Sequence, residues 1–221
     1  MKRYFLPIMV MCILFTLVFG GPLVRSASTF TKDDFAILNG MKEYLPDNIV
    51  VIDDTAYVYV ERIDFQSFYR GFALLKPFQI NKIVIDLYSH GGAVFDAMAM
   101  GAIITEQIKS GKTVIINARG LVASAGLIIL ISGSSGHRYI DQDSMIMFHE
   151  ISVYDFQSLK TVTDKEEEAR ILRLIQDRMN FYITTRSKIS SKDLNDKIKK
   201  REFWLSAQDA IQYGFADAFI K

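Results

Sequence analysis

Two spacings of hydrophobic residues alternate along the chain from about residue 30 onward. Short runs rich in β-branched and aromatic residues are typical of strands. Runs of this kind cover residues 48–53, 56–61, 82–89, 113–118, 137–140 and 144–149. The polar residues Asp53, Asp54 and Thr55 separate the first two runs, and they predict a hairpin because such residues favour tight turns.

Elsewhere the apolar residues recur at every third or fourth position, which predicts amphipathic helices. This spacing covers residues 31–45, 65–78, 91–111, 159–188, 190–201 and 205–217. The longest of these segments places five apolar residues on one face, opposite a charged face: Ile171, Leu172, Leu174, Ile175 and Met179. Strands that alternate with helices predict the α/β class, with right-handed βαβ units, a mainly parallel sheet and functional residues at the strand ends.

The first residues follow a different pattern. Lys2 and Arg3 precede an uncharged apolar run from Tyr4 to Phe19, which is the layout of a secretory signal. The run is short for a membrane span, which needs about 20 residues. We expect residues 1–28 to be a signal peptide or a membrane anchor through residues 4–20, and residues 29–221 to be one exported (periplasmic or extracytoplasmic) domain. A buried N-terminal helix is the alternative.

Composition narrows the function classes. The chain has 221 residues, 50% of them hydrophobic and 23% charged, with a formal net charge of +1. This is a folded chain with no basic surplus, so nucleic acid is not expected as a partner. The three histidines are far apart and lack paired carboxylates or thiols at ligand spacing, so no metal and no other cofactor is predicted. The only cysteine, Cys12, lies in the apolar N-terminal run, so a disulfide is not expected either.

Two glycine-containing loops are candidates for chemistry. Ser89–Gly92 follows a predicted strand, and its glycine pair lets backbone N–H groups approach a ligand. Ala123–Gly126 follows the predicted strand 113–118 and a turn at Gly120, and places Ser124 among residues with small side chains. A serine at a helix start would meet free N–H groups that stabilise an oxyanion. The structural alternatives are an ordinary strand-to-helix turn and an N-cap serine.

A histidine, His149, ends the last predicted strand of this region. One histidine at a strand end is often only a core residue. Together, however, a diglycine turn, a serine among small residues and a strand-end histidine supply an oxyanion donor, a nucleophile and a base.

These three motifs resemble those of the Clp protease proteolytic subunit and its relatives on the crotonase fold, over roughly residues 48–219. The three motifs are Ser89–Gly92, Ala123–Gly126 and Met145–His149, and the closing segment around Leu205-Ser206-Ala207 and Tyr213-Gly214 also matches. The resemblance implies a Clp/crotonase-like ββα superhelix with a protruding handle helix, from about Leu159 to Arg186, and self-association into a ring.

The resemblance also implies the catalytic roles. Ser124 would attack a peptide carbonyl, His149 would act as general base and acid, and the N–H groups of Gly92 and Ala125 would form the oxyanion hole.

The third triad member departs from the family pattern. Ungapped matching puts Ile198 at the position of the family's acid, and an alkyl side chain cannot orient an imidazolium. Asp193, Asp196 and Glu202 are close in sequence. Asp193 fits the first turn of a helix that begins after Ser190 or Ser191, so Asp196 is the candidate acid.

We therefore expect a serine endopeptidase that cleaves peptides or unfolded proteins. The signal-like N-terminus predicts that it works outside the cytoplasm, either exported or tethered to the membrane, and without an ATP-driven partner. Two alternatives stay open at this point: a catalytically silent assembly protein of the same fold, and a crotonase-type enzyme acting on an acyl-thioester, with Asp96 as the nearest carboxylate to either loop.

Overall fold

The computed structural model describes residue 40 and residues 45–152 and 161–221. The chain divides into two units, residues 1–41 and 42–221, and the elements named below all belong to the second. The expected signal or anchor segment lies outside the described residues, and so does nearly all of the helix expected over 31–45. The division between residues 28 and 29 therefore stays a prediction.

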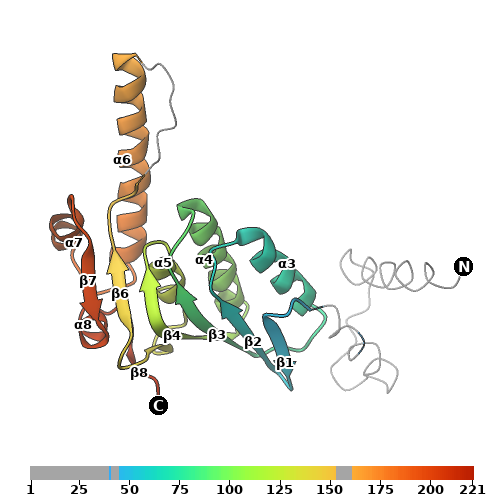
Figure 1. Cartoon of the computed structure of the whole chain (residues 1–221). Helices are drawn as coiled ribbons and strands as arrows, with labels where there is room; N and C mark the ends of the chain where they lie inside the picture. The colour runs from blue at the N-terminus through green and yellow to red at the C-terminus, as the bar shows by residue number, and fades with distance from the viewer. Residues whose placement is uncertain (1–39, 41–44, 153–160) are drawn as a thin grey trace, which may run out of the picture. The chain divides into compact units, whose positions relative to one another are not determined.

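The strands of the described residues form one sheet, in the order β1-β2-β3-β4-β5-β8, and β6 pairs with both β4 and β7 (Figure 1). Their bounds are β1 Ile49–Ile52, β2 Thr55–Val60, β3 Lys82–Ser89, β4 Thr113–Ala123, β5 Arg138–Ile140, β6 Met145–Phe148, β7 Phe203–Ser206 and β8 Ala218–Phe219. The β1–β2 hairpin and the β6–β7 pair are antiparallel and the other pairs are parallel. The mainly parallel α/β sheet predicted from the sequence is confirmed.

The helices follow the predicted order. They are α3 Phe65–Leu75, α4 Val94–Lys109, α5 Gly126–Leu130, α6 Val162–Thr184, α7 Ser191–Ile198 and α8 Ala207–Gln212. Local signals set several of their ends. Asp64 caps α3, accepting the N–H of Ser67, and Ser190 caps α7, accepting the N–H of Asp193. Asp193 therefore has the helix-capping role expected for it.

The core is one hydrophobic cluster that lies between β1–β4 and the helices α3, α4 and α5 and continues to buried residues of α6, α7 and α8. Alternate side chains of β3, including Ile83, Ile85 and Leu87, are fully buried. They belong to one hydrophobic cluster with Phe72 of α3 and Met100 of α4. This core holds the parallel strands in register, so the loops that leave their carboxyl ends have fixed starting points.

Several predicted elements end at other residues than expected, and the reason is clear for β4 and for the last helix. β4 does not stop at Ala118 but runs through Gly120, which has φ +65°, to Ala123. The register between β3 and β4 shifts after Leu87, and this bulge accommodates the glycine. The last predicted helix is shorter, because residues 203–206 pair with β6 as β7 and the helix begins only at Ala207.

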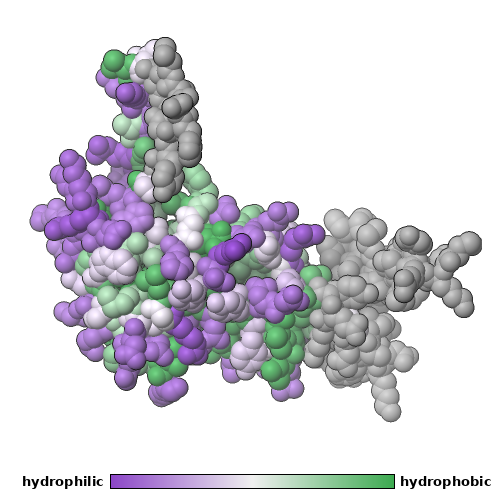
Figure 2. All heavy atoms as spheres, viewed as in Figure 1, coloured by the Kyte–Doolittle hydropathy of each residue, from purple (hydrophilic) through white to green (hydrophobic). Residues whose placement is uncertain are grey.

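The predicted apolar face of α6 is only partly buried. Met179 is 2% exposed, but Ile171 is 43% and Leu174 62% exposed. The amino-terminal part of α6 extends away from the sheet (Figure 1), and hydrophobic atoms reach the surface at its free end, where Val162 is 75% exposed (Figure 2). Apolar periodicity marks a face that avoids water, but it does not say which chain covers that face.

Candidate active site

Three parallel strands end at the same edge of the sheet and bring the candidate loops together. Ser89 at the end of β3 pairs with Val122 of β4, and Ala123 at the end of β4 pairs with Met147 of β6. The carboxyl ends of parallel strands share one edge. Ser124, the diglycine turn and His149 each follow one of these ends, so segments far apart in the sequence leave the sheet side by side.

Ser124 has a strained backbone. Its φ is +53°, in the left-handed region that costs a non-glycine residue about 1–2 kcal/mol. Its N–H donates to the carbonyl of Met147 at 2.7 Å, which ties the turn to β6. The alternative role as N-cap is absent, because α5 begins two residues later, is capped by Ala125 and receives no side-chain hydrogen bond at its cap. A non-glycine residue held in this region is frequent at functional sites.

The first glycine of the diglycine turn packs directly against Ser124. Gly91 has φ +100°, and a Cβ atom there would lie 2.7 Å from Cβ and 3.3 Å from Oγ of Ser124. Real Cβ atoms do not approach another carbon atom this closely. Glycine is therefore required at position 91 both by its backbone conformation and by its contact with the serine turn.

The two predicted oxyanion donors flank this contact. Gly92 forms a parallel bridge with Ile63, and a Cβ at position 92 would lie 2.8 Å from Cβ of that residue. No hydrogen-bond acceptor within the described part of the chain takes the N–H of Ala125. The helix that follows has only five residues, so its dipole adds little, and stabilisation of an oxyanion here would rest on the individual N–H groups.

His149 is half-buried and lies one residue beyond β6. Its Nδ1 atom contacts the backbone carbonyl of Glu150. Among the described residues, no hydrogen bond joins its ring to Ser124 or to a carboxylate side chain. The structure thus brings the segments of Ser124 and His149 to one edge without closing their hydrogen bond.

Asp196 makes no hydrogen bond with His149 among the described residues. The carboxylate of Asp196 accepts a hydrogen bond from Lys192, 3.2 Å away on the same exposed face of α7. Ile198, at the position of the family's acid, is 1% exposed and belongs to the hydrophobic core. Glu202 accepts a hydrogen bond from Trp204. Each of these three positions therefore has another role in the structure.

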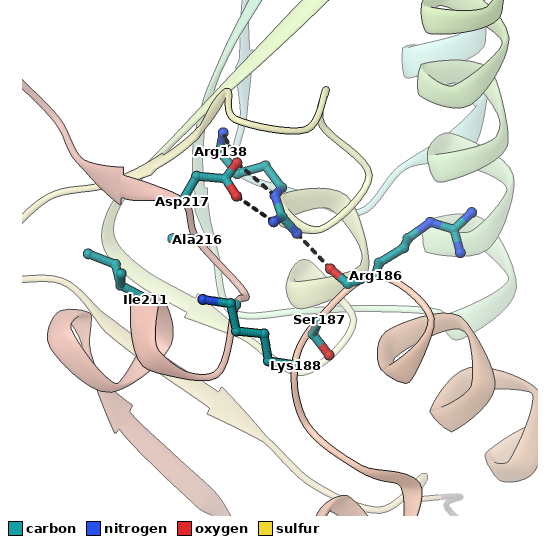
Figure 3. Close-up of a pocket in the computed structure, with 8 residues that line it drawn as sticks. Arg138, Arg186, Ser187, Lys188, Ile211, Ala216 and Asp217 are labelled. Carbon is teal, nitrogen blue, oxygen red and sulfur yellow. Dashed lines mark hydrogen bonds and ion pairs between the residues drawn. The ribbon is translucent and has the colours of Figure 1, made fainter.

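A cavity lies at a different place. It has a volume of about 220 Å³ and is lined by residues around Arg138, Lys188 and Asp217. Figure 3 shows Arg138 bound to both carboxylate oxygens of Asp217, at 2.5 and 3.0 Å, and to the carbonyl of Arg186 at 2.7 Å. Arg138 and Asp217 satisfy one another, so this ion pair is a structural link between β5 and the carboxyl-terminal segment, referred to below as the clamp.

This clamp predicts a dependence of stability on pH. Burial alone would raise the pKa of Asp217, but hydrogen bonds from the side chain and backbone of Arg138 outweigh it and lower that pKa. A carboxyl group whose pKa is lower in the folded than in the unfolded protein stabilises the fold at every pH above its pKa in the unfolded chain, about 3.9. This stabilisation is lost as the pH falls through the pKa of the group in the folded protein. The stability deficit of Asp217→Asn, measured by urea unfolding, should therefore be largest at about pH 5–7 and should shrink below about pH 4. A deficit independent of pH would contradict this account.

No group of three or more His, Cys, Asp or Glu side chains that could hold a metal ion is present in the part of the chain that the structure describes.

Comparison with known proteins gives a consistent result. The Clp protease family model matches residues 68–221. The ATP-dependent Clp protease proteolytic subunit 3 of Synechococcus sp. (strain CC9902) is 30% identical over 138 residues, which are 62% of this chain and 66% of that protein. Subunit 2 of Treponema pallidum (strain Nichols) is 27% identical over 157 residues, 69% of this chain and 73% of that protein. The chain therefore spans about two thirds of the length of these relatives.

The fold comparison agrees with the sequence comparison. The solved structure of a ClpP1 mutant from Listeria monocytogenes matches with a TM-score of 0.61 and 25% identity, covering 76% of this chain and 92% of that one. The predicted Clp/crotonase-like fold is confirmed by this match. The family match covers well over half of the chain and includes the loops of Ser124 and His149. The chain belongs to the Clp protease family.

Proposed function

We propose that this protein is a serine endopeptidase that cleaves peptides or unfolded proteins. The observation that carries the proposal is the conformation of Ser124, which is held in a left-handed turn against Gly91. This turn lies at the edge of the sheet where β6, the strand before His149, also ends. Such strain persists only where the surrounding structure enforces it. Asp53 and Lys200 have a similar φ, but Ser124 differs from them because it lies against Gly91 at the carboxyl ends of β3, β4 and β6.

The residues would act in the following order. Nε2 of His149 takes the proton of the Ser124 hydroxyl as Oγ attacks the peptide carbonyl. The N–H groups of Ala125 and Gly92 receive the negative charge that develops on the carbonyl oxygen. His149 then gives its proton to the leaving amine, and a water molecule, activated by the same imidazole, releases the acyl group from the serine.

A covalent probe tests the proposal directly. A fluorophosphonate should label the native chain at one site, and mass spectrometry of the digested protein should find the label on the peptide that carries Ser124. His149→Ala should slow the labelling strongly, because the serine loses its base. Labelling of the native chain at other serines only, or no labelling at all, would overturn the proposal.

A catalytically silent assembly protein is the second candidate. The observation in its favour is that no carboxylate side chain hydrogen-bonds to His149 among the residues described. A serine–histidine pair without an orienting group is a weak catalyst. The probe distinguishes the two candidates, because a silent protein keeps the fold but does not react.

We also propose that the chain forms a homo-oligomer, a ring as in the family it resembles, in which α6 supplies part of the interface. Four apolar side chains of this helix are substantially exposed in the single chain: Val162, Ile171, Leu174 and Phe181. Exposed apolar surface on this scale is typical of contacts between subunits.

The cellular location is likewise a proposal. The charged start and apolar run of residues 4–19 support export or tethering to a membrane, without an ATP-driven partner. No helix among the described residues is both long and apolar enough to cross a bilayer, and residues 4–19 lie outside that set. Cell fractionation should find the protein in the extracytoplasmic or membrane fraction. Recovery of the full-length chain in the cytoplasm would contradict this.

A further inference from the structure

The contact between His149 and the next residue decides which ring nitrogen carries the hydrogen. Nδ1 lies against the backbone carbonyl of Glu150. A carbonyl oxygen only accepts hydrogen bonds, so in the neutral ring Nδ1 carries the hydrogen and Nε2 keeps its lone pair. This is the tautomer that a general base needs toward a serine hydroxyl. Orientation of the ring therefore depends on what holds this carbonyl in place.

The carbonyl of Glu150 belongs to the same rigid peptide plane as the N–H of Ile151. In a trans peptide these two groups point in opposite directions. The N–H of Ile151 donates to Oε1 of Gln176, in α6, at 2.7 Å. Gln176 thereby fixes the direction of the N–H, and with it the direction of the carbonyl that faces His149.

Gln176 is itself held by a chain of amides. Its Nε2 donates to Oδ1 of Asn180 at 2.8 Å, and Nδ2 of Asn180 donates to Oδ1 of Asn195, in α7, at 2.5 Å. Asn180 is only 2% exposed. Because the N–H of Ile151 can only donate, Gln176 must present its oxygen there and its NH₂ group to Asn180. A satisfied network of this kind is rigid.

A second contact involves the side chain of Glu150. The carboxylate of Glu150 accepts the N–H of Lys200 at 2.9 Å. Lys200 lies between α7 and β7, and β7 pairs antiparallel with β6, with Phe203 opposite Phe148. The segments after β6 and before β7 are therefore adjacent, and the carboxylate of Glu150 joins them.

We propose that the peptide group between Glu150 and Ile151 takes the place of the triad carboxylate, and that Gln176 is the positioning residue that orients it. The inference rests on the proposed peptidase function and names the group that orients its base. It accounts for a buried alkyl side chain at position 198 and for the pairing of Asp196 with Lys192. Gln176 acts on His149 through the peptide and does not touch the reacting atoms.

The kinetic test compares two substitutions at one position in the full-length chain. Gln176→Met keeps the length of the side chain but removes the acceptor for Ile151, so kcat for a fluorogenic peptide should fall about 10- to 100-fold with KM nearly unchanged, because the base is misplaced. Gln176→Glu keeps the oxygen acceptor for Ile151 but loses the NH₂ donor to Asn180, so kcat should fall less than in Gln176→Met, by about threefold to tenfold. Urea unfolding of both variants separates this effect from a loss of folded protein.

A spectroscopic readout does not require catalysis. In ¹⁵N NMR of the imidazole groups, the His149 signals, assigned by their loss in His149→Gln, should report the Nδ1–H tautomer in the unsubstituted protein. Gln176→Met should shift them toward a mixture of tautomers, and Gln176→Glu, which keeps the acceptor for Ile151, should shift them less. An Nε2–H tautomer in the unsubstituted protein would overturn the proposal.

The competing carboxylate supplies the matched control. Asp196→Asn should leave kcat unchanged, since its side chain pairs with Lys192. A large loss of kcat in Asp196→Asn, with none in Gln176→Met, would overturn the inference while leaving the peptidase proposal intact. If the unsubstituted protein and His149→Ala are equally inactive toward probe and peptide, the proposed function itself fails.

Discussion

Ser124→Ala is expected to lower kcat/KM for peptide hydrolysis by at least about 10³-fold, because it removes the nucleophilic oxygen and leaves only binding and oxyanion contacts. The fold should persist, since alanine keeps the Cβ atom of serine and the N–H that bonds to Met147. The unfolding free energy should change by less than about 0.5 kcal/mol. Peptide hydrolysis and urea unfolding of the same preparation measure both quantities.

Two further substitutions make this expectation sharper. Ser124→Gly should also be inactive but at least as stable as the unsubstituted protein, because glycine adopts the φ of +53° without strain. Ser110→Ala is the control. Ser110 is an exposed serine at the carboxyl end of α4, and the helix extends about 24 Å from its first residue to this position. This variant should retain full activity. Substantial turnover by Ser124→Ala would show that another group is the nucleophile.

Gly91→Ala is the second substitution with a large expected effect. The added Cβ would lie 2.7 Å from Cβ of Ser124 and 3.0 Å from the carbonyl oxygen of Ala123. The serine turn would have to move, and displacement of a nucleophile by about 1 Å costs roughly 10²-fold in rate. Backbone strain at the φ of +100° adds about 1–2 kcal/mol of instability, and the steric overlap adds about 1–3 kcal/mol.

Gly111→Ala separates strain from steric contact. Gly111 has φ +92°, almost the same as Gly91, but a Cβ atom there would meet nothing within 4 Å. This variant should lose only the strain energy, about 1–2 kcal/mol, and should keep its kcat. Equal kinetic effects of the two substitutions, measured with one peptide substrate, would show that contact with Ser124 is not what makes position 91 important.

Local patterns in the sequence predicted most of the element order. The polar residues Asp53, Asp54 and Thr55 marked the hairpin, and Ser190 or Ser191 marked the start of α7. These features depend on residues within one or two turns of one another, so periodicity and capping chemistry report them directly. The end of β4 was predicted too early, because Gly120 resembles a turn signal while pairing with β3 and β6 accommodates it as a bulge.

The candidate site was predictable as a set of residue types but not as a geometry. The diglycine turn, Ser124 and His149 could be named from motif order, and the sheet brings their segments to one edge. No local feature of Gln176 distinguishes it from other polar residues of a long amphipathic helix. Its bond to Ile151 joins residues 25 positions apart, across two elements.

The sequence by itself determined the alternation of strands and helices, their caps and the residue types available for chemistry, because those follow from burial patterns and backbone preferences over short distances. Only the tertiary structure decided three further features: the left-handed turn of Ser124 against Gly91, the exposure of the apolar face of α6, and the backbone carbonyl that meets His149. These depend on the register between β3, β4 and β6 and on the packing of α6 beside them. Register and packing are properties of the whole buried core, and no single segment carries them.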